Sequence, residues 1–169
     1  IVDLTHEGEF DYVISTGVIH HTKDPQKSLS KLVETTKDDG ALFIMVYAIY
    51  LRVGVYFMQD AFRYLDLKPT TKDIGIAKRL INLSLQNHYV HNYIKEAENS
   101  IGTKDLTFDA GFVDTFFNAR DVAYDIFQLK ELIGNAGAYF QSWGDNSAFY
   151  RKVFNFSAAK NLNQAFDNL

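Results

Sequence analysis

Two adjacent histidines are the residues in this sequence whose side chains are best suited to catalysis. His20 and His21 follow Thr16, Gly17 and Val18, directly after a short apolar segment. Imidazole titrates near neutrality, so either ring could act as a general base. Side chains of neighbouring residues point in different directions, which makes the pair a poor joint ligand for a metal ion. The sequence therefore favours proton transfer over metal binding, with capping of the helix that starts at Asp24 as the alternative.

A second polar segment follows the next apolar run along the chain. Tyr47, Tyr50 and Arg52 come directly after that run. Because ligands of open α/β sheets bind beyond the carboxyl ends of the strands, we expect both polar segments to share one rim of a sheet. Gly17 would let the backbone approach a ligand closely there. The two tyrosines could equally be packing residues at the end of a strand.

A strand–helix–strand unit is needed to position these residues. Residues 10–15 and 41–47 are apolar and rich in β-branched or aromatic side chains, which predicts two strands, the second buried on both faces of a parallel sheet. Asp24 and Pro25 predict the start of the connecting helix. Residues 37–40 predict a turn before the second strand. The first fifty residues therefore indicate a βαβ unit.

The residues after the βαβ unit predict mainly helices, and strands are predicted again only near the carboxyl end. Amphipathic patterns predict helices over residues 54–67, 71–86, 88–97 and 125–136. Other segments predict a packed loop over 100–118, strands over 138–143 and 149–156, and a polar tail over 161–169. We expect one domain over residues 1–169, divided into a βαβ core (1–50), a helical segment (51–120), and a final helix, strands and tail (121–169).

Composition excludes several classes of protein. A hydrophobic content of 47% and an aromatic content of 15% are typical of a folded globular chain, and a net charge of -4 does not suggest a nucleic-acid partner. The absence of Cys excludes disulfides, thiolate metal sites and thiol catalysis. No apolar run approaches the roughly 20 residues of a membrane-spanning helix. We expect a cytoplasmic protein that binds neither nucleic acid nor membrane.

Residues 10–25 strongly resemble one segment of the class I S-adenosylmethionine-dependent methyltransferases. Their sequence is Phe-Asp-Tyr-Val-Ile-Ser-Thr-Gly-Val-Ile-His-His-Thr-Lys-Asp-Pro. In that family a Phe-Asp pair opens the fourth strand, a Gly-Val-Leu-His-His loop follows, and Asp-Pro starts the next helix. Residues 37–40 are similar to the family's Lys-Pro-Gly-Gly turn, with Asp-Asp in place of Pro-Gly. Residues 50–67 and 105–146 are also similar to one bacterial subgroup, with Asp121, Tyr124, Trp143 and Asp145 in the later region.

This resemblance implies a Rossmann-like, mostly parallel α/β sheet with a helical insert. It implies S-adenosylmethionine as the cofactor and methyl transfer to an oxygen, nitrogen or carbon of a small or medium acceptor. By the resemblance, Thr16, Gly17 and Val18 would line the methionine part of the cofactor. His20 and His21 would lie near the methyl-transfer centre, without a metal ion.

On the acceptor side, the resemblance assigns Tyr47, Tyr50 and Arg52 to the substrate, with the helical insert as lid and wall. The family's glycine-rich loop and its ribose-binding acidic residue are not in this sequence. We therefore expect a fragment of a longer enzyme, whose partner is the missing amino-terminal half of the same domain. The isolated chain is expected to be inactive, to bind no cofactor, and to aggregate or dimerise through its first strand.

Two other interpretations fit the sheet that the sequence predicts. One is a non-catalytic methyltransferase-like domain that serves as a binding or scaffold module. The other is a different α/β nucleotide enzyme, such as a dehydrogenase, although that interpretation does not account for the two histidines before Asp24 and Pro25. The identity of the methyl acceptor and the oligomeric state do not follow from the sequence.

Overall fold

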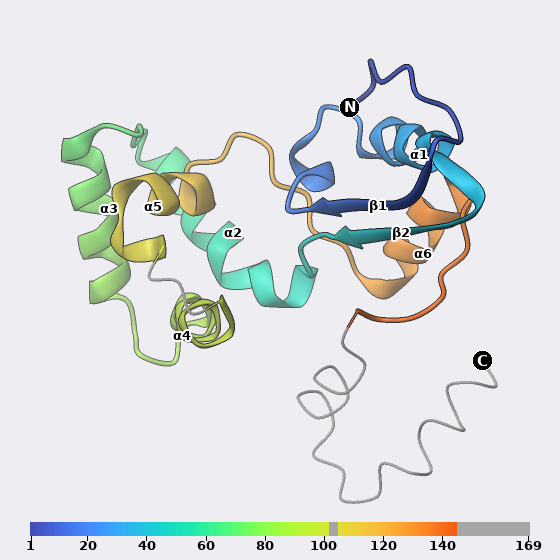
Figure 1. The fold of residues 1–169 in the computed structure, drawn as a ribbon. Coiled ribbons are helices and arrows are strands. Elements are labelled where there is room, and N and C mark those ends of the chain that lie inside the picture. The colour runs from blue at the N-terminus through green and yellow to red at the C-terminus, as the bar shows by residue number, and fades with distance from the viewer. Residues whose placement is uncertain (102–104, 145–169) are drawn as a thin grey trace, which may run out of the picture.

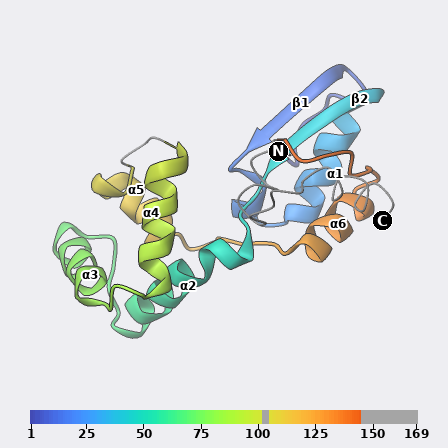
Figure 2. The same cartoon turned by 90° about the horizontal axis from the view of Figure 1, so that it is seen from below.

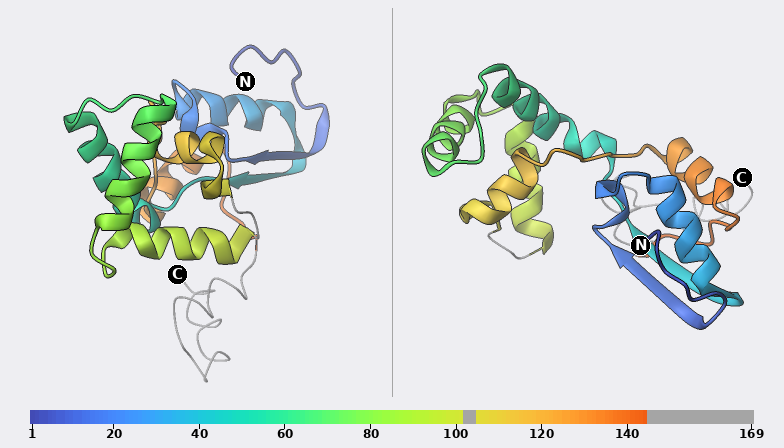
Figure 3. Two further views of the ribbon diagram at one scale, coloured as in Figure 1. Left: turned by 90° about the vertical axis from the view of Figure 1, so that its left-hand side faces the viewer. Right: turned by 90° about the horizontal axis from the view of Figure 1, so that it is seen from above.

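The computed structural model describes residues 1–101 and 105–144, which form two lobes joined by two chain segments (Figures 1 and 3). The sheet lobe consists of β1 (Phe10–Thr16), η1 (Ile19–His21), α1 (Pro25–Thr35), β2 (Thr36–Met45) and α6 (Ile126–Asn135). The helical lobe consists of α2 (Ile49–Tyr64), α3 (Thr71–Leu83), α4 (Tyr89–Ile101), η2 (Asp105–Thr107) and α5 (Asp109–Phe116). The described chain is thus a mixed α/β structure.

β1 and β2 form a two-stranded parallel sheet, as the sequence predicts. Phe10 pairs with Thr36 whereas Tyr12 pairs with Ala41, so β2 bulges between its first residue and Ala41. Residues 37–40 therefore belong to β2, and the predicted turn is wrong. A Cβ atom on Gly40 would lie 2.8 Å from a Thr36 methyl carbon and 2.9 Å from a backbone oxygen of β1. This crowding explains why the bulge contains a glycine.

The two helices of the sheet lobe begin at side chains that cap them. The carboxylate of Asp24 accepts a hydrogen bond from the backbone N–H of Lys27 at 2.9 Å, and Pro25 occupies the first position of α1. Asp125 and Gln128 form a reciprocal capping box at the start of α6. Both helices thus start where the sequence predicts.

Both α1 and α6 cover the same face of the sheet (Figure 2). Leu29, Leu32 and Leu132 are buried there against Leu42 and Ile44 of β2. The opposite face carries exposed apolar side chains, which are Tyr12, Ile14, Phe43 and Met45. The predicted burial of the second strand on both faces is therefore wrong in the part of the chain that the structure describes. The strand is apolar throughout, but only its alternate residues meet a helix.

The helical lobe has a core of its own, and its boundaries differ from those predicted. α2 begins at Ile49 rather than residue 54, so Tyr50 and Arg52 belong to a helix and not to a loop after the strand. α3 ends at Leu83. α5 lies inside the predicted loop over 100–118, where a buried aromatic face outweighs its weak local pattern. The core residues are Val55, Met58, Phe62, Ile74, Ala77, Ile81, Val90, Phe112 and Phe116.

The segment after α6 does not form the strand predicted over residues 138–143. Gly137 adopts a φ of 82°, which ends α6 and fits the predicted glycine cap. Residues 138–144 then run without pairing to β1 or β2. The predicted strand over 149–156 and the predicted tail over 161–169 lie outside the described residues.

Candidate functional site

The carboxyl end of β1 turns sharply into η1. Gly17 has a φ of 70°, a left-handed conformation that favours glycine, and its N–H donates to the carbonyl of Met45 at 3.1 Å. Thr16 and Val18 on either side are exposed. This turn brings His20 and His21 to the junction between the two lobes.

His20 is fully buried in a stack of rings. Its ring centroid lies 4.2 Å from that of His21 and 4.0 Å from that of Tyr47. Within the described residues, neither ring nitrogen of His20 has a hydrogen-bond partner. Burial, followed by electrostatic interactions with His21 and Arg52, lowers the pKa of His20 to about 4. The ring is therefore neutral at pH 7.

His21 lies at the surface side of this stack and is only partly buried. Its Nδ1 atom is 2.8 Å from the backbone carbonyl oxygen of Arg120, which belongs to the segment returning from the helical lobe. The amide nitrogen of Asn118 is 3.3 Å from the same ring nitrogen. The Tyr47 ring meets His21 edge to face, with centroids 5.5 Å apart. The ring of His21 is thus fixed by contacts far away in the sequence.

Arg52 lies inside the junction with only 1% of its surface exposed. Its guanidinium forms an ion pair with the buried carboxylate of Asp121, and its Nη1 donates to the Tyr93 hydroxyl at 3.0 Å. The guanidinium carbon also lies 4.2 Å from the centre of the Tyr47 ring. Burial raises the pKa of Tyr47, although the positive charge of Arg52 opposes that shift.

Two further side chains of α2 hold the Asp121 carboxylate. The Tyr56 hydroxyl donates to it at 3.3 Å, and the Gln59 amide donates to it at 3.4 Å. Burial raises the pKa of Tyr56, which therefore keeps its proton as a donor. Asp121 is thus tied to three side chains of one helix, which satisfies a buried charge.

The segment around Asp121 is also bound to the sheet lobe through its backbone. The N–H of Val122 donates to the carbonyl of His20 at 3.1 Å. Tyr124 donates to the carbonyl of Tyr47 at 2.8 Å and accepts from the N–H of Ile49 at 3.1 Å. These bonds place the returning segment directly against the histidine turn.

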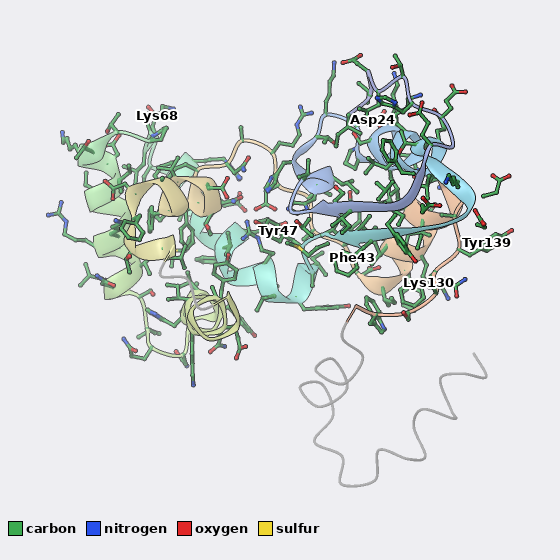
Figure 4. All side chains as sticks on the ribbon, in the orientation of Figure 1. Asp24, Phe43, Tyr47, Lys68, Lys130 and Tyr139 are labelled. Atoms are coloured by element: carbon green, nitrogen blue, oxygen red, sulfur yellow. The ribbon has the colours of Figure 1, made fainter. Side chains whose placement is uncertain are left out.

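The predicted site residues come together only in part. His20, His21, Tyr47 and Arg52 form one contiguous cluster at the ends of the strands, and Figure 4 shows Tyr47 where the two lobes meet. Tyr50, by contrast, is 80% exposed on the first turn of α2.

Three members of the cluster do not stand out in the sequence. Asp121 lies within residues 105–146, which resemble the bacterial subgroup. The one available signal there was an acidic side chain that could serve as the ion-pair partner of Arg52. Tyr56 and Tyr93 carry no such signal, because their contacts with Asp121 and Arg52 depend on the way the helices fold back.

Residues 3–44, which include β1, the histidine turn, α1 and nearly all of β2, match the family described as "Methyltransferase domain". Residues 3–44 are therefore similar to part of a class I methyltransferase domain. Over 165 residues the chain is 25% identical to an uncharacterized protein, syc1184_c, of Synechococcus sp. (strain ATCC 27144 / PCC 6301 / SAUG 1402/1). That alignment covers 96% of this chain and 38% of the relative, so the chain spans little more than a third of that protein's length.

The family that residues 3–44 match typically uses S-adenosylmethionine, and the exposed turn after β1 leaves room for such a ligand. Gly17 has no side chain to obstruct a ligand, and the exposed apolar side chain of Val18 offers packing for a methionine chain. Among residues 1–101 and 105–144, no three His, Asp or Glu side chains are grouped to hold a metal ion. No helix in these same ranges is long and apolar enough to cross a membrane.

Proposed function

We propose that the longer protein containing this domain transfers a methyl group from S-adenosylmethionine to a small or medium acceptor. The observation that carries this proposal is the match of residues 3–44, which includes the histidine turn at the carboxyl end of β1. The bound cofactor supplies a methyl group already activated on a sulfonium. The protein then has to align the acceptor and, for some acceptors, remove a proton.

The cofactor side of the proposed site is the turn after β1. Thr16, Gly17 and Val18 contact the methionine part of the cofactor, on a Rossmann-like sheet that sequence outside this chain completes. The left-handed Gly17 supports this role, because it directs the chain away from the end of β1 and leaves the turn exposed.

The acceptor side of the proposed site is the junction of the two lobes, with the helical lobe as wall and lid. Tyr47 and Tyr50 contact the acceptor in this proposal. Arg52 acts indirectly, because its guanidinium is occupied by Asp121 and Tyr93 and lies against the Tyr47 ring. It therefore positions Tyr47.

The proposal is tested with the natural protein that carries residues 1–169 together with the sequence that precedes Ile1. Isothermal titration with S-adenosylmethionine is expected to show micromolar binding. Replacing Gly17 by Ala is expected to weaken binding at least about tenfold, because a side chain at this φ shifts the turn. Absence of binding by the unmodified protein at millimolar cofactor would overturn the proposal.

Gly137→Ala is the matched control for this substitution. Gly137 also has a left-handed φ, and a Cβ atom there meets nothing within 4 Å. Both substitutions therefore cause the same kind of backbone strain, but only Gly17 lies at the ends of the strands. Equal binding by both variants would argue against a cofactor role for the turn.

A non-catalytic scaffold is the second candidate, and one observation favours it. The sheet face formed by Tyr12, Ile14, Phe43 and Met45 is apolar and exposed in the described structure, as a binding surface would be. The same titration separates the two candidates. A scaffold of this kind binds no S-adenosylmethionine even when the chain is intact.

A further inference from the structure

The geometry points to different roles for the two adjacent histidines: His21 takes a proton from a hydroxyl acceptor through Nε2, whereas His20 is a buried packing residue. This inference rests on the proposed methyl transfer and deepens it, because it assigns the base and narrows the class of acceptor. It is carried by the contacts of the two rings.

The contact between His21 and Arg120 decides which nitrogen of His21 carries the proton. Two groups face Nδ1 of His21 and ask for opposite roles: the Arg120 carbonyl oxygen at 2.8 Å can only accept, and the Asn118 amide nitrogen at 3.3 Å can only donate. The carbonyl contact is the shorter one and has ordinary hydrogen-bond length, so Nδ1 is assigned as the donor to Arg120. In the neutral ring the other nitrogen, Nε2, then has its lone pair free. Among the described residues, the side-chain hydrogen bonds of His21 involve Nδ1 and not Nε2, and the residue is only partly buried.

Asn118 fixes the carbonyl that orients this ring. Its side-chain oxygen accepts from the N–H of Arg120 at 3.0 Å, which holds the short segment between the two residues. Its amide nitrogen donates toward Asp114 at 3.4 Å. The Arg120 carbonyl therefore faces Nδ1 through a local turn of the returning segment. A base oriented by a fixed acceptor on its second nitrogen is a common catalytic arrangement.

His20 lacks each of these properties. It is fully buried, both of its nitrogens lack partners among the described residues, and its ring lies between His21 and Tyr47. The titratable and charged groups that face it are His21 and Arg52, and a positive charge on either would oppose one on the His20 ring. A ring that is neutral and enclosed cannot reach an acceptor, so its contribution is to support the rings beside it.

The proposed step balances with a sulfonium methyl donor. The acceptor oxygen forms a bond to the methyl carbon, and the carbon–sulfur bond breaks with its electron pair left on sulfur as a neutral thioether. The hydroxyl proton passes to Nε2 of His21, which becomes an imidazolium. A base is useful only where the attacking atom loses a proton, so the inference excludes thioether and tertiary-amine acceptors.

The first test observes directly which ring nitrogen of His21 carries the proton, and it does not require enzymatic activity. The natural full-length protein is labelled with ¹⁵N-histidine, and two-bond nitrogen–proton spectra are recorded near pH 8. We expect His21 to carry its proton on Nδ1, with His21→Gln used to assign the signals. A spectrum with the proton on Nε2 would overturn the base role.

The second test measures formation of S-adenosylhomocysteine from S-adenosylmethionine, with the small-molecule fraction of source cells as the supply of acceptor. His21→Gln can still donate to the Arg120 carbonyl but cannot take a proton, so turnover should fall by about 100-fold or more. His6→Gln, an exposed histidine of the sheet lobe, should keep full turnover.

The two tests separate the inference from the function on which it rests. Unchanged turnover in His21→Gln would overturn the base role while the methyltransferase activity stands. No turnover and no cofactor binding by the unmodified protein would overturn the proposed function, and the base role with it.

Discussion

A buried neutral imidazole makes the stability of this chain depend on pH. The pKa of His20 is about 4 in the folded chain, against an ordinary value of 6.5. Between these values the unfolded chain binds more protons than the folded chain. Stability is therefore unaffected by His20 above pH 6.5 and falls as the pH drops toward 4, by up to about 3 kcal/mol.

We predict that His20→Phe removes this part of the pH dependence. The variant keeps a planar ring against Tyr47 but has no group to titrate. Urea unfolding at pH 7 and pH 5 should show a smaller loss of stability for the variant than for the unmodified chain. His6→Gln, whose side chain is about half exposed, should keep the original loss. Equal losses in all three proteins would contradict the prediction.

The ion pair of Arg52 and Asp121 is a second residue-scale feature whose loss can be measured. Asp121→Asn leaves the guanidinium buried without a countercharge, and the free energy of unfolding should fall by about 3–5 kcal/mol. The matched control is Asp60→Asn, which breaks an exposed pair with Arg63 and should cost less than about 1 kcal/mol. Chemical denaturation of the two variants checks this, and similar losses would refute it.

At the scale of elements, α2 and α4 lie backbone against backbone where they cross. A Cβ atom on Gly54 would lie 2.2 Å from the backbone nitrogen of Val90 and 2.3 Å from the carbonyl carbon of Tyr89. Backbone atoms cannot turn aside as a flexible side chain can, so any larger residue must separate the helices.

We predict that Gly54→Ala destabilises the chain by about 3 kcal/mol, because the added methyl group overpacks this crossing. Gly75→Ala in α3 is the matched control, since a Cβ atom there meets nothing within 4 Å. Alanine also favours helix more than glycine, so the control should gain roughly 0.5–1 kcal/mol. Thermal unfolding followed by circular dichroism measures both, and a neutral Gly54→Ala would disprove the clash.

Elements whose signals lie within the element itself, such as helix caps, could be predicted from the sequence. Asp24 with Pro25 marks the start of α1, and Asp125 marks the start of α6, because a cap is a contact between near neighbours in the chain. The two parallel strands were also predictable from their apolar runs. These signals need no knowledge of the rest of the fold.

Elements that depend on distant contacts could not be predicted. The sequence predicts a loop where α5 forms, because the aromatic residues of α5 make a buried face only after α2 and α3 pack beside it. The segment 138–143 has the composition of a strand but pairs with no strand in the described structure. At the site, the histidines and Tyr47 could be found in the sequence, whereas the pairing of Arg52 with Asp121 spans 69 positions.

At the scale of the whole molecule, one uncovered sheet face determines how the isolated chain behaves. Tyr12 and Ile14 of β1 are 79% and 72% exposed, and Phe43 and Met45 of β2 extend the same apolar surface. Among the residues that the structure describes, each strand pairs only with the other, so an edge of β1 is open there as well. An apolar face beside an open edge favours association with other chains.

We predict that residues 1–169 expressed alone self-associate, and that Ile14→Lys reduces the association because it places a charge in the middle of the apolar face. Leu83→Lys is the control, since that leucine is equally exposed but lies on α3. Size-exclusion chromatography with light scattering gives the mass of each protein. A monomeric unmodified chain would contradict the prediction.

The backbone hydrogen bonds of Tyr124 with Tyr47 and Ile49 mark the place where the helical lobe could be exchanged during evolution. These bonds hold the chain together at the point where it leaves the sheet lobe, after Tyr47, and where it returns, at Tyr124. The helical lobe between these two positions is therefore a single insertion in the chain. This insertion can be exchanged for another without altering the pairing of β1 and β2. A gene for such a domain could therefore exchange its helical segment as a unit, and an engineer could cut the chain at the same two positions, beside Tyr47 and beside Tyr124.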